Sequence, residues 1–145
     1  MDKACKKLKK KVIKMVSIAF RDEDISIIFA MTPEMQYNTN IMGLFYPTTN
    51  KIAINPMVFL LSKKQREKVV LHEIGHYIHK KYFNFSAQYL PRKKRGDSSL
   101  YCNSSQMESF AECFADYIYA FNDNKFEKIE KSKRLSKMER LLKSV

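Results

Sequence analysis

Four features are missing from this sequence of 145 residues: a run of 18 apolar residues, a Cys-x-x-Cys pair, an internal repeat and a low-complexity linker. Without a long apolar run, the sequence predicts no membrane-spanning helix. The three cysteines are an odd number without metal-ligand spacing, which favours reduced thiols and a cytoplasmic setting over a disulfide framework. A basic start precedes the apolar residues 12–20, but Lys14 interrupts them, so we expect an amphipathic helix, with secretion as the open alternative.

Acidic residues are also scarce, because 15 Asp and Glu stand against 27 Lys and Arg, for a net charge of +12. The positive charge gathers in three segments, residues 3–14, 92–95 and 125–143. Such a balance favours an acidic partner, whether nucleic acid, an acidic protein or a membrane surface. A solvated surface explains the same composition, and no nucleic-acid-binding motif accompanies it.

The order of hydrophobic patterns predicts one α+β domain over residues 1–145, with a small twisted sheet packed on helices. We expect an amphipathic helix over residues 4–20, a buried strand over 25–30, and a hairpin of strands at 43–46 and 51–54. A long helix should run from about residue 63 to 82 behind a Ser62-x-x-Gln65 capping box. A second should run from about residue 104 to 122. A basic helix or helix pair over 124–144 then lies outside a core of 22–122.

Residues 72–76 read His-Glu-Ile-Gly-His inside the first long helix. Positions four apart share a helix face, so His72 and His76 aim at one point. Together they supply half of a tetrahedral zinc site, and Glu73 is the candidate general base. Gly75 costs the helix about 1 kcal/mol relative to alanine, so we expect another backbone or a substrate to cross closely there.

A catalytic zinc ion takes three protein ligands and keeps one position for water. Glu108 is the leading candidate for the third ligand because His2Glu is a known catalytic set, and Glu112, one turn further along, is the alternative. If Glu108 binds the metal, Glu112 is better used as the carboxylate that holds a zinc-bound histidine in its tautomer. His79 is expected to lie on an exposed or interface face and not to be a ligand.

A Zn²⁺ site of this kind predicts peptide-bond hydrolysis, in which Glu73 takes the proton of a zinc-activated water and returns it to the leaving amine. Tyr101, just before the second long helix, is placed to stabilise the oxyanion, with an ordinary core aromatic as its alternative. An extended substrate most simply adds a strand to the sheet edge near residues 43–46. The chief alternative function is a non-catalytic toxin, inhibitor or nucleic-acid-associated regulator that acts through the basic surface.

Two sets of motifs resemble known zinc peptidases. The residues Asn-Lys-Ile-Ala-Ile-Asn at 50–55, Gln-Arg at 65–66 and the motif at 72–76 resemble the front half of ImmA/IrrE-type metallopeptidases. Tyr101 and residues 108–114 are similar to the catalytic domain of anthrax lethal factor and to the Pro-Pro endopeptidases. Both groups are zincins of the gluzincin type. The resemblance, which covers about residues 41–121, therefore implies that fold, a zinc ligand at Glu108 and, from the second group, an oxyanion role for Tyr101.

Overall fold

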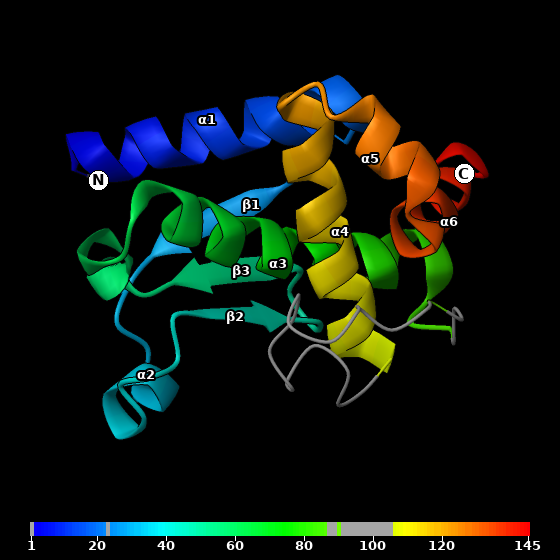
Figure 1. The fold of residues 1–145 in the computed structure, drawn as a ribbon. Coiled ribbons are helices and arrows are strands. Elements are labelled where there is room, and N and C mark those ends of the chain that lie inside the picture. The colour runs from blue at the N-terminus through cyan, green and yellow to red at the C-terminus, as the bar shows by residue number, and fades with distance from the viewer. Residues whose placement is uncertain (1, 23, 87–89, 91–105) are drawn as a thin grey trace.

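The computed structural model describes residues 2–22, 24–86, 90 and 106–145, and Figure 1 shows their arrangement. The elements are, in chain order, α1 (Lys3–Ala19), β1 (Ser26–Phe29), α2 (Pro33–Tyr37), β2 (Gly43–Tyr46), β3 (Lys51–Ile54), the 3-10 helix η1 (Pro56–Leu60), α3 (Lys63–Phe83), α4 (Gln106–Asn122), α5 (Phe126–Lys131) and α6 (Lys133–Lys143). The protein is therefore a small mixed α+β domain, as the sequence predicts. None of the described helices combines the length and the apolar character needed to cross a bilayer.

The described strands form a three-stranded sheet in the order β1-β3-β2. β2 and β3 pair antiparallel with Gly43 opposite Ile54 and Tyr46 opposite Lys51, which confirms the predicted hairpin. β1 pairs with β3 in parallel, with Ile27 beside Ile52. This order leaves β2 at an edge of the sheet.

Local signals at both of its ends define α3. Ser62 Oγ accepts from the Gln65 amide at 3.2 Å, and Gln65 Oε1 accepts from the Ser62 amide at 3.1 Å, which confirms the capping box. At the other end Asn84 adopts a left-handed conformation with φ of 50°. Asparagine tolerates that conformation better than most residues, and it lets the Asn84 amide bond to the Lys80 carbonyl at 2.9 Å.

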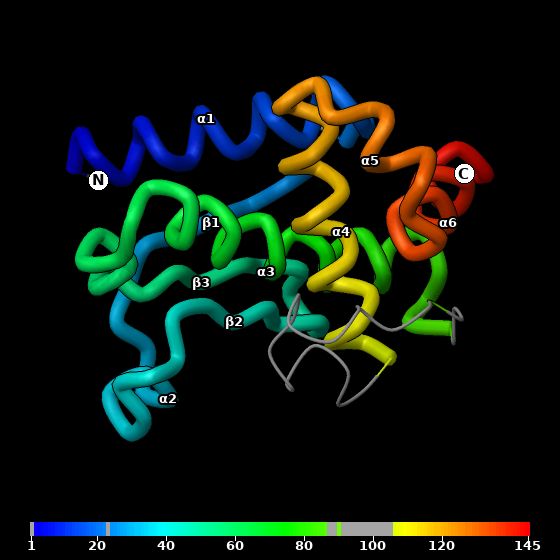
Figure 2. Tube along the Cα trace, viewed as in Figure 1, coloured from blue at the N-terminus to red at the C-terminus, as the bar shows by residue number. Residues whose placement is uncertain are grey.

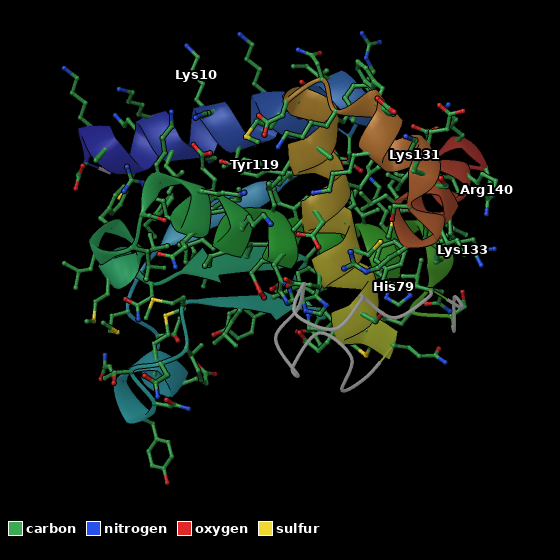
Figure 3. The ribbon with its side chains drawn as sticks, in the orientation of Figure 1. Lys10, His79, Tyr119, Lys131, Lys133 and Arg140 are labelled. Atoms are coloured by element: carbon green, nitrogen blue, oxygen red, sulfur yellow. The ribbon has the colours of Figure 1, made fainter. Side chains whose placement is uncertain are left out.

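α3 is the central helix of the molecule. It contacts β2 and β3 on one side, and α1 and α4 also pack against it. Buried Glu67 of α3 joins the three helices, because it accepts from Lys11 of α1 and from Tyr119 of α4, each at 2.6 Å. Figure 3 shows Tyr119 reaching from α4 into the region between α1 and α3.

The segment after α4 is a helix pair that packs back on the domain. Ile129, Leu135, Met138 and Leu142 are buried, and Arg134 pairs with Asp116 of α4 at 3.0 Å. Figure 2 shows α5 and α6 beside α4, with α1 running along the same side of the molecule. Val12 of α1 and Met138 of α6 belong to the same hydrophobic core as the central helices. Both terminal segments therefore contribute side chains to the core that the sequence predicts over residues 22–122.

Asp22 fixes the chain between α1 and β1 to the C-terminal half of α3. Its carboxylate accepts from Tyr82 Oη at 2.7 Å, Lys81 Nζ at 2.8 Å, the Asp24 amide at 2.9 Å and Tyr77 Oη at 3.1 Å. Burial by itself raises the pKa of Asp22, but these hydrogen bonds outweigh burial and hold the pKa below its ordinary value. The folded state therefore favours the ionised carboxylate.

We predict that Asp22→Asn lowers the free energy of unfolding by about 2 kcal/mol at neutral pH, because hydrogen bonds to a buried charged group are lost. Because the pKa of Asp22 in the folded state lies below the ordinary value of 3.8, this contribution is complete at pH values well above 3.8. It is lost as the pH falls through and below 3.8. Urea unfolding at several pH values should show the two proteins converging in acid.

The matched control is Asp24→Asn, because the Asp24 side chain also pairs with Lys81, at 3.0 Å, but is 79% exposed. Exposed pairs contribute about 0–1 kcal/mol, so this variant should unfold almost like the wild type. Equal losses in the two variants would contradict the role given to Asp22.

Candidate metal centre

α3 brings the side chains of His72, Glu73 and His76 together. One ligand atom from each lies within 4.8 Å of the others, so the group can hold a metal ion. Glu73 and His76 are buried, and the His72 side chain is 16% exposed. The spacing of four residues on a helix thus places both imidazoles at one point, as expected.

α4 supplies a carboxylate to the same point. Glu108 Oε2 lies 2.9 Å from His72 Nε2, and Glu108 Oε1 lies 3.1 Å from His76 Nε2. Zinc bonds of about 2.0–2.2 Å at tetrahedral angles place neighbouring ligand atoms about 3.3 Å apart. Two imidazole nitrogens and one carboxylate are a donor set that suits zinc, so the residues present fit this ion.

Glu112, one turn after Glu108 on α4, reaches the other side of the His72 ring. Its Oε2 lies 3.1 Å from His72 Nδ1. An acceptor in that position holds the proton on Nδ1 and leaves Nε2 available for a metal. His76 differs, since its buried Nδ1 has no hydrogen-bond partner among the described residues.

The charges of the site reinforce these contacts. Burial alone lowers the pKa of His72, but the contacts with Glu108 and Glu112 and the charge of Glu73 raise it to about 10. Burial likewise raises the pKa of Glu108, but the two histidines lower it to about 2. Without a metal ion, His72 is therefore a cation held by two carboxylates, and a metal that binds there takes the place of a proton.

Glu73 differs from Glu108 in its surroundings. Burial raises the pKa of Glu73, and the charges of His72 and His76 only partly oppose that effect. Gly43 at the start of β2 leaves room for this side chain, because a Cβ at position 43 would lie 2.7 Å from Glu73 Cγ. This packing role of Gly43 is absent from the expectations drawn from the sequence, although an isolated glycine in a strand is a signal of close approach.

Gly75 is the point where α3 and α4 cross. A Cβ on Gly75 would lie 2.8 Å from Ala111 Cα and 3.0 Å from the Ala111 carbonyl oxygen. Of the two alternatives that the sequence indicates at Gly75, another backbone or a substrate, the structure shows another backbone. Ala111 lies three residues after Glu108 and one before Glu112, so the crossing brings both carboxylates to the histidines.

The candidate metal centre opens into a cleft of about 780 Å³. Residues 40–45 and Pro47, in and beside edge strand β2, form one wall, and α3 and α4 form the others. Most of the lining surface is apolar, and its apolar side chains include Ile41, Met42, Leu44, Phe45, Leu61, Val69, Phe85 and Met107. The polar side chains are those of the candidate metal centre together with Asn40, Gln65 and Lys68.

His79 is fully buried, which corrects the expected exposed or interface position: its ring stacks on Phe110 with centroids 4.2 Å apart, and its Nε2 lies 2.9 Å from the Ser86 carbonyl oxygen. Burial lowers the pKa of His79, so it is a neutral core side chain.

Tyr101 lies outside the described residues, and its role in stabilising an oxyanion stays a prediction.

We predict that Glu108→Gln weakens zinc binding more than Glu112→Gln does. Loss of a partner behind a ligating histidine costs about 10–100-fold in metal affinity, and loss of a direct ligand should cost more. Competition with a chromophoric chelator measures both constants. A larger loss in Glu112→Gln than in Glu108→Gln would identify Glu112 as the third ligand.

We also predict that Gly75→Ala lowers the free energy of unfolding by about 1–3 kcal/mol, the usual cost of overpacking. Helix propensity alone predicts the opposite sign, a gain of up to about 1 kcal/mol. Denaturant unfolding of the metal-free protein distinguishes the two. Zinc affinity should fall in parallel, because α4 must move away from α3, and a more stable variant would contradict the close crossing.

Comparison with known proteins leaves the family resemblance of the motifs as a prediction: no protein-family model, no curated protein and no solved structure matches this chain.

Proposed function

We propose that this protein is a zinc-dependent endopeptidase that hydrolyses peptide bonds of a protein substrate. The observation that carries the proposal is the position of Glu108, whose two carboxylate oxygens meet the Nε2 atoms of His72 and His76 at 2.9 and 3.1 Å. Because Glu108 would supply the carboxylate ligand and Glu112 contacts the other nitrogen of His72, Glu73 is left for proton transfer. A buried carboxylate without a ligand role beside a metal site is what a hydrolytic mechanism requires.

Zinc held by His72, His76 and Glu108 would act as a Lewis acid toward a substrate carbonyl and would make a water nucleophilic near neutral pH. The proton chemistry then belongs to Glu73. Because burial raises its pKa, Glu73 is a better base than an exposed carboxylate and can hold the proton until the leaving amine accepts it.

β2 would position an extended substrate. As an edge strand it pairs only with β3 among the described strands, and its residues line the cleft beside Glu73. A peptide that adds to this edge would place its backbone along the cleft, with main-chain hydrogen bonds for affinity. The apolar side chains that line the cleft around the candidate metal centre favour apolar side chains in the substrate.

The decisive variant is Glu73→Gln, which keeps the shape of the side chain and removes its basicity. We expect it to retain one zinc ion per chain and to lose about 10²–10⁴-fold in cleavage rate. Metal content by mass spectrometry and cleavage of a peptide library measure the two effects separately.

The matched control is Glu127→Gln, because Glu127 is 78% exposed on α5, away from the site. It should leave both zinc content and cleavage unchanged. A zinc-loaded wild type that cleaves no peptide, or a Glu73→Gln variant as active as wild type, would overturn the peptidase assignment in favour of a binding protein.

A further inference from the structure

The helix α1 has an unusual concentration of one charge. Seven lysines lie among its 17 residues, and no acidic residue lies between Lys3 and Ala19. Its apolar residues are turned inward; the buried ones are Cys5, Leu8, Val12, Met15 and Val16. Within the described part of the chain, Lys11 is the one lysine of α1 with an ion pair, to Glu67.

The exposed lysines of α1 are aligned. Lys3, Lys7, Lys10 and Lys14 are separated by four, three and four residues, so they lie along one stripe of the helix. All four are exposed, and Figure 3 shows Lys10 projecting away from the body of the protein. We call these four residues the lysine stripe. Like charges at this spacing repel each other, so the lysine stripe lowers the stability of the isolated protein. A bound anion would relieve this repulsion and raise the stability.

The positive surface continues onto the start of α3. Lys63 and Lys64 are both exposed there. Contact with Lys11 and its charge lower the pKa of the Lys63 ammonium, and Lys7 adds to that effect. The lysine stripe therefore borders further cations and no neutralising acidic group of its own helix.

The basic tail is different, although its sequence is equally rich in lysine. α5 has two lysines and two glutamates, and α6 has five basic residues and one glutamate. Several of these charges are paired: Lys131 with Glu127, Lys143 with Glu139 and Arg134 with Asp116. α6 also carries a row of basic residues at helical spacing, Lys133, Lys137 and Arg140, but the lysine stripe is longer by one cation and its helix contains no acidic residue.

From this arrangement we propose that the lysine stripe of α1 binds the phosphate backbone of a nucleic acid. A helix of 17 residues is about 25 Å long at about 1.5 Å per residue. The four lysines of the stripe span 11 residue steps of this helix, about 16.5 Å, so one positive charge recurs about every 5.5 Å along the helix. Such a regular row of cations suits the regular row of phosphates along a nucleic-acid strand better than an acidic protein, whose carboxylates have no fixed spacing.

The packing of α1 argues against a membrane as the partner. A helix that lies in a bilayer surface needs an exposed apolar face, and the apolar face of α1 is buried against α3 and α4. Ile18, which is 56% exposed, is the one exposed large hydrophobic residue of α1. No α1 residue is among the described residues that line the cleft, so a bound nucleic acid would leave the candidate metal centre accessible.

The test uses the full chain, fluorescein-labelled nucleic acid and fluorescence anisotropy at several salt concentrations between about 50 and 200 mM. The probes are a mixed-sequence DNA duplex and a single-stranded RNA, which distinguish the two sources of the same phosphate chemistry. The stripe variant carries Lys→Gln at positions 3, 7, 10 and 14, because glutamine keeps a good helix propensity. The control variant carries Lys→Gln at positions 125, 128, 133 and 137, which removes the same number of charges from the tail.

The wild type and the control variant should bind with similar salt dependence. For the duplex, the stripe variant should lose about 3.6 from the slope of log K against log salt, since each phosphate contact contributes about 0.9. The single variants Lys7→Gln and Lys10→Gln should each lose about 0.9 and report on the same contacts with little change to the helix. The effect should be the same in Glu73→Gln, so it is independent of catalysis.

Three results would overturn the proposal. The first is the absence of binding to either probe in the wild type. The second is an equal loss in the stripe and control variants, which would indicate attraction by net charge alone. The third is tighter, stripe-dependent binding to vesicles of phosphatidylserine and phosphatidylcholine or to polyglutamate than to either nucleic acid, which would assign the surface to a membrane or to an acidic protein.

Discussion

The contact between the backbones of Gly75 and Ala111 determines how closely α3 and α4 approach, and the rest of the site depends on that distance. His72 and His76 come before and after Gly75 in α3, and Glu108 and Glu112 come before and after Ala111 in α4, close to the two histidines. A carboxylate reaches both imidazoles only because no side chain separates the two helices at this point. Gly43 has the same role in β2, where the absence of a Cβ leaves room for the Glu73 side chain.

Buried ionic groups hold the helices in that relation. Glu67 joins α1, α3 and α4, and Asp116 of α4 joins Lys68 of α3 at 2.8 Å to Arg134 of α6 at 3.0 Å. A buried charge without partners is strongly unfavourable, and each of these carboxylates has at least two. Such groups favour one relative placement of the helices, whereas apolar contacts alone tolerate small displacements. The candidate metal ligands thus rest on a scaffold with little freedom to shift.

The sequence predicts the local features of the fold well, because their causes are local. Alternation and β-branched residues locate the three strands, and Ser62 and Gln65 mark the start of α3 within the chain itself. The spacing of four residues between His72 and His76 likewise determines their shared direction. Ligand chemistry points to Glu108, and the structure places it in contact with both histidines, while its role as a metal ligand stays a prediction.

The errors and omissions have a different origin, since they depend on what packs against a residue. His79 shares a helix side with His72 and His76, yet Phe110 of α4 covers it, and no local pattern says which part of a helix side is covered. The same applies to Gly43, whose importance lies in a side chain 30 residues away. Whether the basic tail packed on the domain was also undetermined, because amphipathic helices pack on partners and on their own domain with the same periodicity.

The capping box at Ser62 and the left-handed Asn84 define the two ends of α3. The helix is also tied to its surroundings near both ends, by Glu67 to α1 and α4 and by Lys81 to Asp22. Each residue of an α-helix turns the chain by about 100°. An insertion or deletion of one residue between Ser62 and His72 would therefore rotate the two imidazoles away from Glu108 while the helix remained intact. Positions of α3 outside the candidate metal centre and the Gly75 crossing can change by substitution, but the number of residues before its first histidine cannot change without loss of the candidate metal centre.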